Sequence, residues 1–342
     1  MNPHASPAIA IIVAERGPDG ARLVAIDARG DRQFALLTPP ASRARDTHPA
    51  VSPDGAWIVF ASSRGRDLGV TSLWIAPLGA AQTPRALTGP TAIDANPVWT
   101  RDGTAIIFAS TRDGGDFDLW RLPMRAGRAA GPPIQLTHAA GHEVAPTVAR
   151  DGTIIFAAVT PRAEALTETT QVSRARTSHL VQRAPDGTLT ALTDGPDDGS
   201  PALSPDETQL VFTCAGGSAE LENRELCIAP RDALRTAHRL VELPPTDEDS
   251  PTWSPDGRYV LATSLVRGAR TMLFSSAIAI ELTTPPVARI LVDHAGAVAR
   301  LTPVIAPRSA PDLAVNPAYL PTLARIMTRA IEAQRQADEA RE

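Results

Sequence analysis

An acidic side chain recurs at one position of a repeated sequence pattern, three residues before a proline. These acids are Asp46, Asp94, Glu143, Asp198 and Glu248. Arg300 stands at the equivalent position before Pro303. Carboxylates brought close together raise one another's pKa and attract a counter-ion. The set therefore predicts a cation site or a contact for a basic segment of a partner. The alternative is a structural role, in which each acid accepts hydrogen bonds from loop amides or neighbouring elements.

The residues directly before the prolines belong to the same candidate site. They are His48, Asn96, Ala145, Ser200 and Ser250. Their side chains are chemically mixed, which favours a binding pocket over a catalytic centre. We therefore predict no catalytic residue, and of this group we take His48 and Asn96 as binding candidates.

Two further patterns that could carry chemistry are incomplete. His138 and His142 are four residues apart, but they fall in a predicted loop, where this spacing does not direct both imidazoles at one zinc ion. A serine hydrolase needs Gly-x-Ser-x-Gly, and the nearest string, at residues 216–220, lacks the second glycine.

The prolines that follow the acids define an internal repeat, with spacings of 48, 49, 55 and 50 residues. They are Pro49, Pro97, Pro146, Pro201 and Pro251. Each proline is followed by a turn, such as Ser-Pro-Asp-Gly at 52–55, and then by an apolar run, such as Ile106-Ile107-Phe108. Since successive residues of these runs are apolar, both faces of the strand must be buried. A period near 50 with several strands per unit is typical of propeller blades.

The two ends of the chain supply complementary parts of one further blade. Residues 8–40 carry three strand signals and lack the first strand, whereas residues 301–307 carry a first strand without a second. We therefore predict an all-β fold over 8–307: a six-bladed propeller of four-stranded antiparallel blades, closed by N- and C-terminal strands. The predicted blades are 8–40 with 301–307, 46–89, 94–138, 143–194, 198–243 and 248–293.

The motifs Pro-x-x-Ser-Pro-Asp-Gly, Ile-x-Phe-x-Ser and the closing Leu-Thr resemble the WD40-like repeats of TolB-like β-propellers. The resemblance covers residues 8 to about 307. It implies a binding or interaction scaffold of the bacterial cell envelope, in the periplasm, although no signal peptide is visible. In such a propeller the connections before the inner strands gather around one mouth of the central channel, so the five acids and Arg300 are expected there.

Composition excludes several function classes. The chain has 342 residues, 43% of them hydrophobic and 21% charged, with a formal net charge of −5. This balance gives no electrostatic basis for nucleic-acid binding, and no apolar stretch approaches the roughly 20 residues of a membrane span. The 32 Pro and 23 Gly indicate many turns.

Cys214 and Cys227 are the only cysteines. They fall in adjacent predicted strands, so a disulfide is feasible if the register brings them together, and two buried thiols are the alternative. A disulfide would imply an extracytoplasmic location.

Two segments depart from the repeat. Residues 160–176 form the longest insertion, which is either functional or simply mobile. Residues 317–342 carry apolar side chains at helical spacing after Pro321, and they predict a short amphipathic C-terminal helix that packs on the propeller or binds a partner.

These observations predict a non-enzymatic scaffold, most simply a monomer, that presents an acidic channel mouth to a protein segment or small ligand. No cofactor is expected, apart from a Ca²⁺ ion as an option in the channel. The alternative is a lactonase- or lyase-like propeller enzyme with a divalent metal in the channel.

Overall fold

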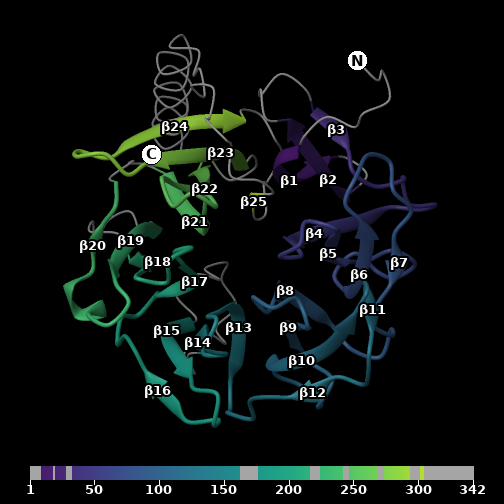
Figure 1. Cartoon of the computed structure of the whole chain (residues 1–342), viewed down its shortest axis with the longest axis horizontal. Helices are drawn as coiled ribbons and strands as arrows, with labels where there is room; N and C mark the ends of the chain where they lie inside the picture. The colour runs from purple at the N-terminus through teal and green to yellow at the C-terminus, as the bar shows by residue number, and fades with distance from the viewer. Residues whose placement is uncertain are drawn as a thin grey trace, which may run out of the picture.

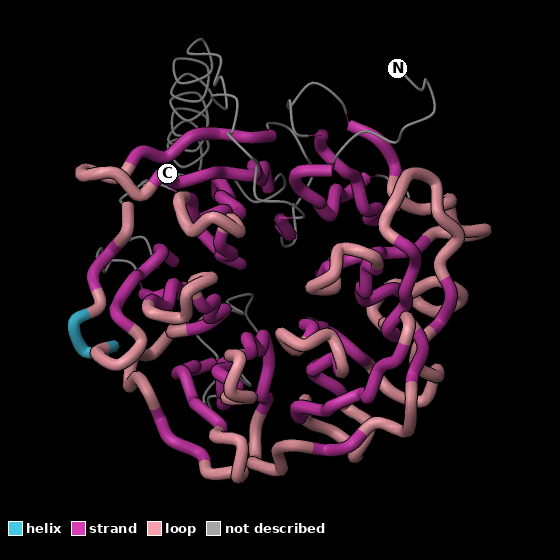
Figure 2. Tube along the Cα trace, viewed as in Figure 1, coloured by secondary structure: helices cyan, strands magenta, loops and turns pink. Residues whose placement is uncertain are grey.

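The structure is a computed structural model in which the strands are arranged in a ring around a central axis (Figure 1). It describes residues 9–17, 20–27, 33–161, 176–215, 224–241, 246–267, 273–292 and 301–303. Within these ranges the one helix is the 3-10 turn η3 (Leu234–Thr236), on the outer side of the ring (Figure 2). The predicted C-terminal helix at 317–342 lies outside the described residues.

Within the described residues, twenty-five strands account for almost all of the regular structure. The first sheet contains β1 (Ile9–Gly17), β2 (Gly20–Asp27), β3 (Gln33–Ala35), β4 (Ala44–Val51), β5 (Trp57–Ser62), β6 (Ser72–Pro77), β7 (Arg85–Ala86) and β25 (Leu301–Pro303). The second contains β8 (Asp94–Trp99), β9 (Ala105–Ser110), β10 (Asp118–Arg125), β11 (Arg128–Ala129) and β12 (Ile134–Gln135).

The other three sheets have four antiparallel strands each. The third contains β13 (His142–Val148), β14 (Ile154–Pro161), β15 (Arg176–Arg183) and β16 (Leu189–Ala191). The fourth contains β17 (Gly199–Leu203), β18 (Gln209–Ala215), β19 (Arg224–Pro230) and β20 (His238–Arg239). The fifth contains β21 (Thr246–Trp253), β22 (Tyr259–Arg267), β23 (Leu273–Glu281) and β24 (Val287–Val292).

The propeller therefore has five sheets, or blades, and the prediction of six is wrong. The difference arises where the first two predicted units meet, because β2 pairs in parallel with β4 and joins them into one eight-stranded sheet. Gly20 makes this pairing possible: its φ is +129°, and a β-carbon there would lie 1.8 Å from the Ala44 carbonyl oxygen. At one edge of this sheet β1 pairs with β25, so the two terminal segments meet as the sequence predicts.

The core lies between neighbouring sheets and is built mainly from the second strand of each repeat. All six residues of β9 are buried. Alternate side chains face opposite neighbours: Phe108 packs with Val59 and Leu73 of the first sheet, whereas Ile107 packs with Phe156 of the third. The apolar runs are thus buried on both faces, as the sequence indicates.

The inner strands β4, β8, β13, β17 and β21 lie nearest the axis (Figure 1). Each contains a register shift at its proline, and the residue before that proline has a φ of +44° to +52°. These five residues are His48, Asn96, Ala145, Ser200 and Ser250. A bulge therefore recurs at the same place in each inner strand and fixes how the strand passes the channel.

Candidate functional site

The repeat acids lie at the beginning of the inner strands and are buried. Asp46 stands opposite Ser62 in the β4–β5 pair and accepts a hydrogen bond from its Oγ at 2.6 Å. The Arg64 guanidinium donates to its two carboxylate oxygens at 3.1 and 2.7 Å. Asp94 has the equivalent partners, a serine sixteen and an arginine eighteen residues further along the chain. Both carboxylates are therefore satisfied within their own sheet.

Threonines from the preceding sheet complete the environment of two acids. The Thr88 hydroxyl donates to Asp94 Oδ2 at 2.5 Å, and the Thr137 hydroxyl donates to Glu143 Oε2 at 3.1 Å. Each hydroxyl also accepts a backbone N–H from the third strand of its own repeat, from Leu73 in β6 and from Leu119 in β10. These threonines end the Leu-Thr motif of the preceding sheet. Their hydrogen bonds to Asp94 and Glu143 therefore connect one sheet to the next.

Glu143 has no arginine partner and differs from the first two acids. Burial, together with a hydrogen bond to the neighbouring Asp118 carboxylate, raises the pKa of Glu143 to about 8. Thr137 offsets part of this effect, and the negative charges of Asp118 and Asp116 add to it. At neutral pH the protonated Glu143 can donate a hydrogen bond to the Asp118 carboxylate.

The remaining members of the predicted set are Asp198, Glu248 and Arg300, and each has a different environment or lies outside the described residues. Burial raises the pKa of Asp198, and hydrogen bonds from Thr193 and the Gly195 backbone oppose that shift. Glu248 is buried and accepts a hydrogen bond from Ser264 Oγ at 3.1 Å. Arg300 lies outside the described residues.

The structure therefore places the repeat acids at junctions within and between sheets. The hydrogen-bonded role considered for them is present at all five acids, while direct contact with a ligand or cation stays a prediction. Among the described residues, no group of three or more His, Cys, Asp and Glu side chains is placed to hold a metal ion.

A cavity of about 470 Å³ lies at the other end of the inner strands, where they enter the Ser-Pro-Asp-Gly turns. Each sheet contributes its repeat proline and the residue after it, such as Ala50, Val98 or Thr147. Two sheets also contribute a tryptophan, Trp99 or Trp253. The two indole N–H groups are satisfied by carbonyls of the neighbouring sheet, Ala50 at 3.2 Å and Ala202 at 2.9 Å. The cavity wall thus combines proline and indole rings with polar groups such as Ser52, Thr147 and Thr252.

The rim of the cavity is formed by the second residue of each turn. These positions carry Pro53, Arg101, Arg150, Pro205 and Pro255. Sequence reasoning missed this cavity because it concentrated on residues before the prolines. The replacement of proline by arginine in two adjacent repeats was a visible signal.

The sequence pattern of the TolB beta propeller domain matches residues 41–226, more than half of the chain. The chain belongs to this TolB propeller family. No curated protein matches the sequence. Among the residues whose placement is described, no helix has the length and hydropathy needed to cross a membrane.

Solved structures with the same fold include TolB proteins and enzymes. TolB from Acinetobacter baumannii is 17% identical with a TM-score of 0.63, over 86% of this chain and 66% of that one. The gluconolactonase XC5397 from Xanthomonas campestris is 17% identical with a TM-score of 0.52, over 86% and 90%. The oligogalacturonate lyase from Vibrio parahaemolyticus is 14% identical with a TM-score of 0.51, over 83% and 73%. At these identities the likeness concerns the fold alone.

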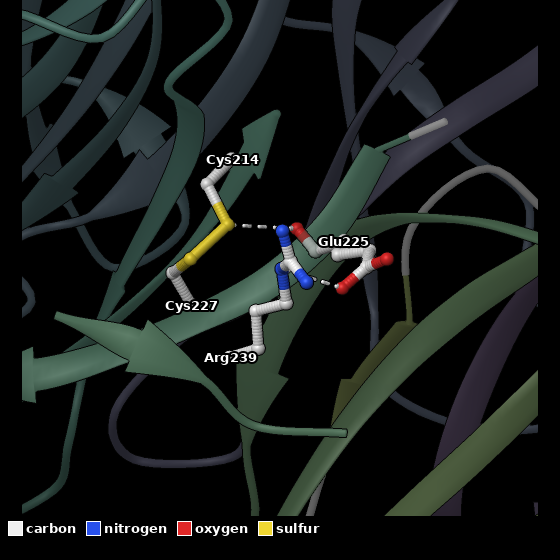
Figure 3. The surroundings of a disulfide bond; sticks show 4 residues. All are labelled: Cys214, Glu225, Cys227 and Arg239. Carbon is white, nitrogen blue, oxygen red and sulfur yellow. Dashed lines mark hydrogen bonds and ion pairs between the residues drawn. A yellow bond between two sulfur atoms is a disulfide. The ribbon is translucent and has the colours of Figure 1, made fainter. Parts of the chain in front are cut away.

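A disulfide joins Cys214 of β18 to Cys227 of β19 in this TolB propeller (Figure 3). The cysteines are diagonal rather than opposite, since Cys214 faces Glu225 and Cys227 faces Phe212, and their Cα atoms are 5.9 Å apart. Cys214 occupies the position that Ser62 and Ser110 hold in the first two sheets. The sequence left a disulfide and two thiols open, and the structure has the disulfide.

Replacing both cysteines with serine is expected to lower the free energy of unfolding by about 3 kcal/mol, because the bridge closes a loop with a sequence separation of 13 residues. Urea unfolding of the wild type with and without reductant, beside the Cys214→Ser/Cys227→Ser variant, measures this. The reduced wild type should resemble the variant, and the variant should not respond to reductant. Equal stability of all three forms would contradict the prediction.

Proposed function

We propose that this TolB-family propeller is a non-enzymatic binding scaffold whose central cavity receives a segment of a protein partner. The observation that carries the proposal is the cavity itself, about 470 Å³ and walled by the repeat prolines and two tryptophans. This volume lies within the range of ligand pockets, which combine apolar and aromatic side chains with polar groups that orient the ligand.

The construction of the wall supports binding to a preformed surface. Proline has a fixed φ and no N–H to satisfy, so a wall of prolines offers apolar rings without unpaired backbone donors. Buried acids, such as the Arg112–Asp94 pair at 2.6 Å, hold the inner strands to their neighbours. Little conformational entropy should then be lost on the protein's side when a segment binds.

The disulfide supports an extracytoplasmic location for the binding scaffold. Stable disulfides are typical of oxidising compartments. Together with the TolB-like sequence pattern, the Cys214–Cys227 bond favours the periplasm or another extracytoplasmic site. Isolation of the protein from its natural source under thiol-blocking conditions should yield the oxidised form.

Site-specific photo-cross-linking tests the binding function. A photoreactive phenylalanine is placed at position 53 on the cavity rim, and in a control at position 189, an exposed site on the outer strand β16. We expect a discrete adduct from position 53 only, and we expect the purified partner to bind the unmodified propeller. Binding should be lost when the rim is narrowed by Pro53→Trp and Pro255→Trp, both at exposed turn positions.

Two results would contradict the proposal. The first is equal labelling from positions 53 and 189, which would place the interaction outside the cavity. The second is metal-dependent turnover of a lactone or uronate by the purified chain, which would favour the enzyme alternative.

A further inference from the structure

The cavity rim is chemically asymmetric. At five equivalent turn positions, three sheets carry proline and two adjacent sheets carry arginine, Arg101 and Arg150. Among the residues that line the cavity, the positive side chains are therefore confined to one side of the rim.

Both arginine side chains extend to the neighbouring sheet and donate a hydrogen bond to one of its backbone carbonyls. Arg101 Nε donates to the Val148 carbonyl at 3.3 Å, and Arg150 Nη2 donates to the Pro205 carbonyl at 3.1 Å. Neither Nη group of Arg101 donates a hydrogen bond to another residue within the described ranges. The side chains are thus positioned while retaining donors for a further acceptor.

Glu207 contacts both rim arginines, and its backbone has a positive φ. Its Oε1 accepts the Arg150 backbone N–H at 2.8 Å and lies 3.7 Å from Arg101 Nε, while its Oε2 lies 3.7 Å from Arg231 Nη1. Its φ is +64°, at the turn position where the other four repeats have glycine with φ of +69° to +87°. A residue with a side chain is strained in that region, and such strain is concentrated at functional sites.

The charges around Glu207 are unbalanced. One carboxylate lies among three guanidinium groups, and Asp151 is 3.8 Å from Arg231. Partial burial lowers the pKa of Arg101; the Glu207 carboxylate opposes this shift, and the positive charge of Arg150 adds a smaller lowering. The turn aspartates are directed to their own loops, as Asp102 is to Thr100 and Thr104. An additional anion beside Arg101 would therefore be favoured electrostatically.

We propose that Arg101 and Arg150 form a subsite for a carboxylate carried by the segment that enters the cavity. This inference rests on the proposed binding function. Guanidinium groups match carboxylates through paired N–H donors, and these charge-assisted bonds are stronger than neutral ones. The apolar body of the ligand would lie against the prolines and tryptophans, with its carboxylate at the arginine side of the rim.

The carboxylate could belong to a peptide or to a free organic acid, and a retention experiment distinguishes the two. The full chain is immobilised and exposed to three probes: an N-acetylated random tetrapeptide pool with free C-terminal carboxylates, the same pool as C-terminal amides, and 4-phenylbutyrate. Bound material is quantified by mass spectrometry. The variants are Arg101→Gln/Arg150→Gln, the rim-narrowing Pro53→Trp/Pro255→Trp, and, as a matched control, Arg235→Gln in the exposed 3-10 turn.

We expect the wild type and Arg235→Gln to retain carboxylate peptides at least about tenfold better than amides, a difference that Arg101→Gln/Arg150→Gln abolishes. Arginine-dependent retention of 4-phenylbutyrate alone would support the carboxylate subsite with a small acid as its ligand. Equal retention of acids and amides, lost only on narrowing the rim, would overturn the subsite and leave the binding function standing. Absence of any retained probe would overturn the subsite, and unsuccessful cross-linking from position 53 would separately overturn the binding function.

Discussion

Replacing Asp94 with alanine is expected to lower the free energy of unfolding by about 3 to 5 kcal/mol. Asp94 is fully buried and accepts hydrogen bonds from Thr88, Ser110 and Arg112. Removing its carboxylate leaves all three donors without this acceptor in a place that water reaches poorly. The positive charge of Arg112 also loses its counter-ion.

The position of Arg112 makes this loss difficult to relieve. Its guanidinium carbon lies 5.0 Å from the Phe108 ring centroid and 5.2 Å from that of Trp120, and its side chain is 18% exposed. Leaving this site would expose apolar surface of the core between the first two sheets. Staying there without Asp94 leaves a poorly hydrated cation.

A double-mutant cycle in urea separates the pair from the packing. Asp94→Ala should lower the free energy of unfolding far more in the wild type than in the Arg112→Met background, because replacing both charged residues removes the unpaired cation. Asp113→Ala, at an exposed neighbouring loop position, is the matched control and should change stability by less than about 0.5 kcal/mol. If Asp94→Ala cost less than about 1 kcal/mol, the acid would not be a structural element, and a role in ligand contact would be favoured instead.

The sequence predicted the blade elements well because the relevant signals are local. Proline marks the inner strand, Ser-Pro-Asp-Gly specifies the turn, and runs such as Ile106-Ile107-Phe108 require burial on both faces. The merging of the first two units was not predictable in this way. It depends on Gly20 adopting a φ of +129° so that two backbones from distant segments can pair.

The functional site was predicted less completely for a different reason. The acids were recognised from their spacing, but their satisfaction depends on partners in the next strand. A serine sixteen residues after Asp46, Asp94 and Glu248 was visible in the sequence and marks the cross-strand hydrogen bond. Comparison of the turns would likewise have shown Arg101, Arg150 and Glu207 as departures from a proline- and glycine-rich pattern. Their convergence on one side of a cavity required the three-dimensional structure.

Glu143→Gln is expected to make the protein more stable than the wild type at alkaline pH, by a few kcal/mol at pH 9. The folded-state pKa of Glu143 is raised to about 8 from an ordinary value of 4.5, mainly by burial. Between these values the folded protein holds a proton that the unfolded chain releases. Stability contributed by this group is therefore complete below about pH 4.5, falls as pH rises, and is lost above about pH 8.

Glutamine reproduces the protonated form of Glu143 without titrating. Its amide can donate to Asp118 as the protonated acid does, and its carbonyl oxygen can accept the Thr137 hydroxyl, which donates to Glu143 at 3.1 Å. The variant should therefore match the wild type near pH 4.5 and exceed it progressively up to about pH 8. The measurement is the difference in urea-unfolding free energy between the two proteins from pH 4.5 to 9, which cancels titration elsewhere, including that of Asp198.

Asp232→Asn, at an exposed position outside the strands, is the control and should give a constant difference across the same range. A constant difference for Glu143→Gln would show that Glu143 is ionised in the folded protein at neutral pH, and the raised pKa of Glu143 would then be wrong. The rising difference would show instead that this acid, unlike Asp46 and Asp94 with their arginines, is held neutral at the junction of the second and third sheets. Equivalent positions of the repeat would then be stabilised in two ways, by an ion pair with arginine at Asp46 and Asp94 and by a retained proton at Glu143.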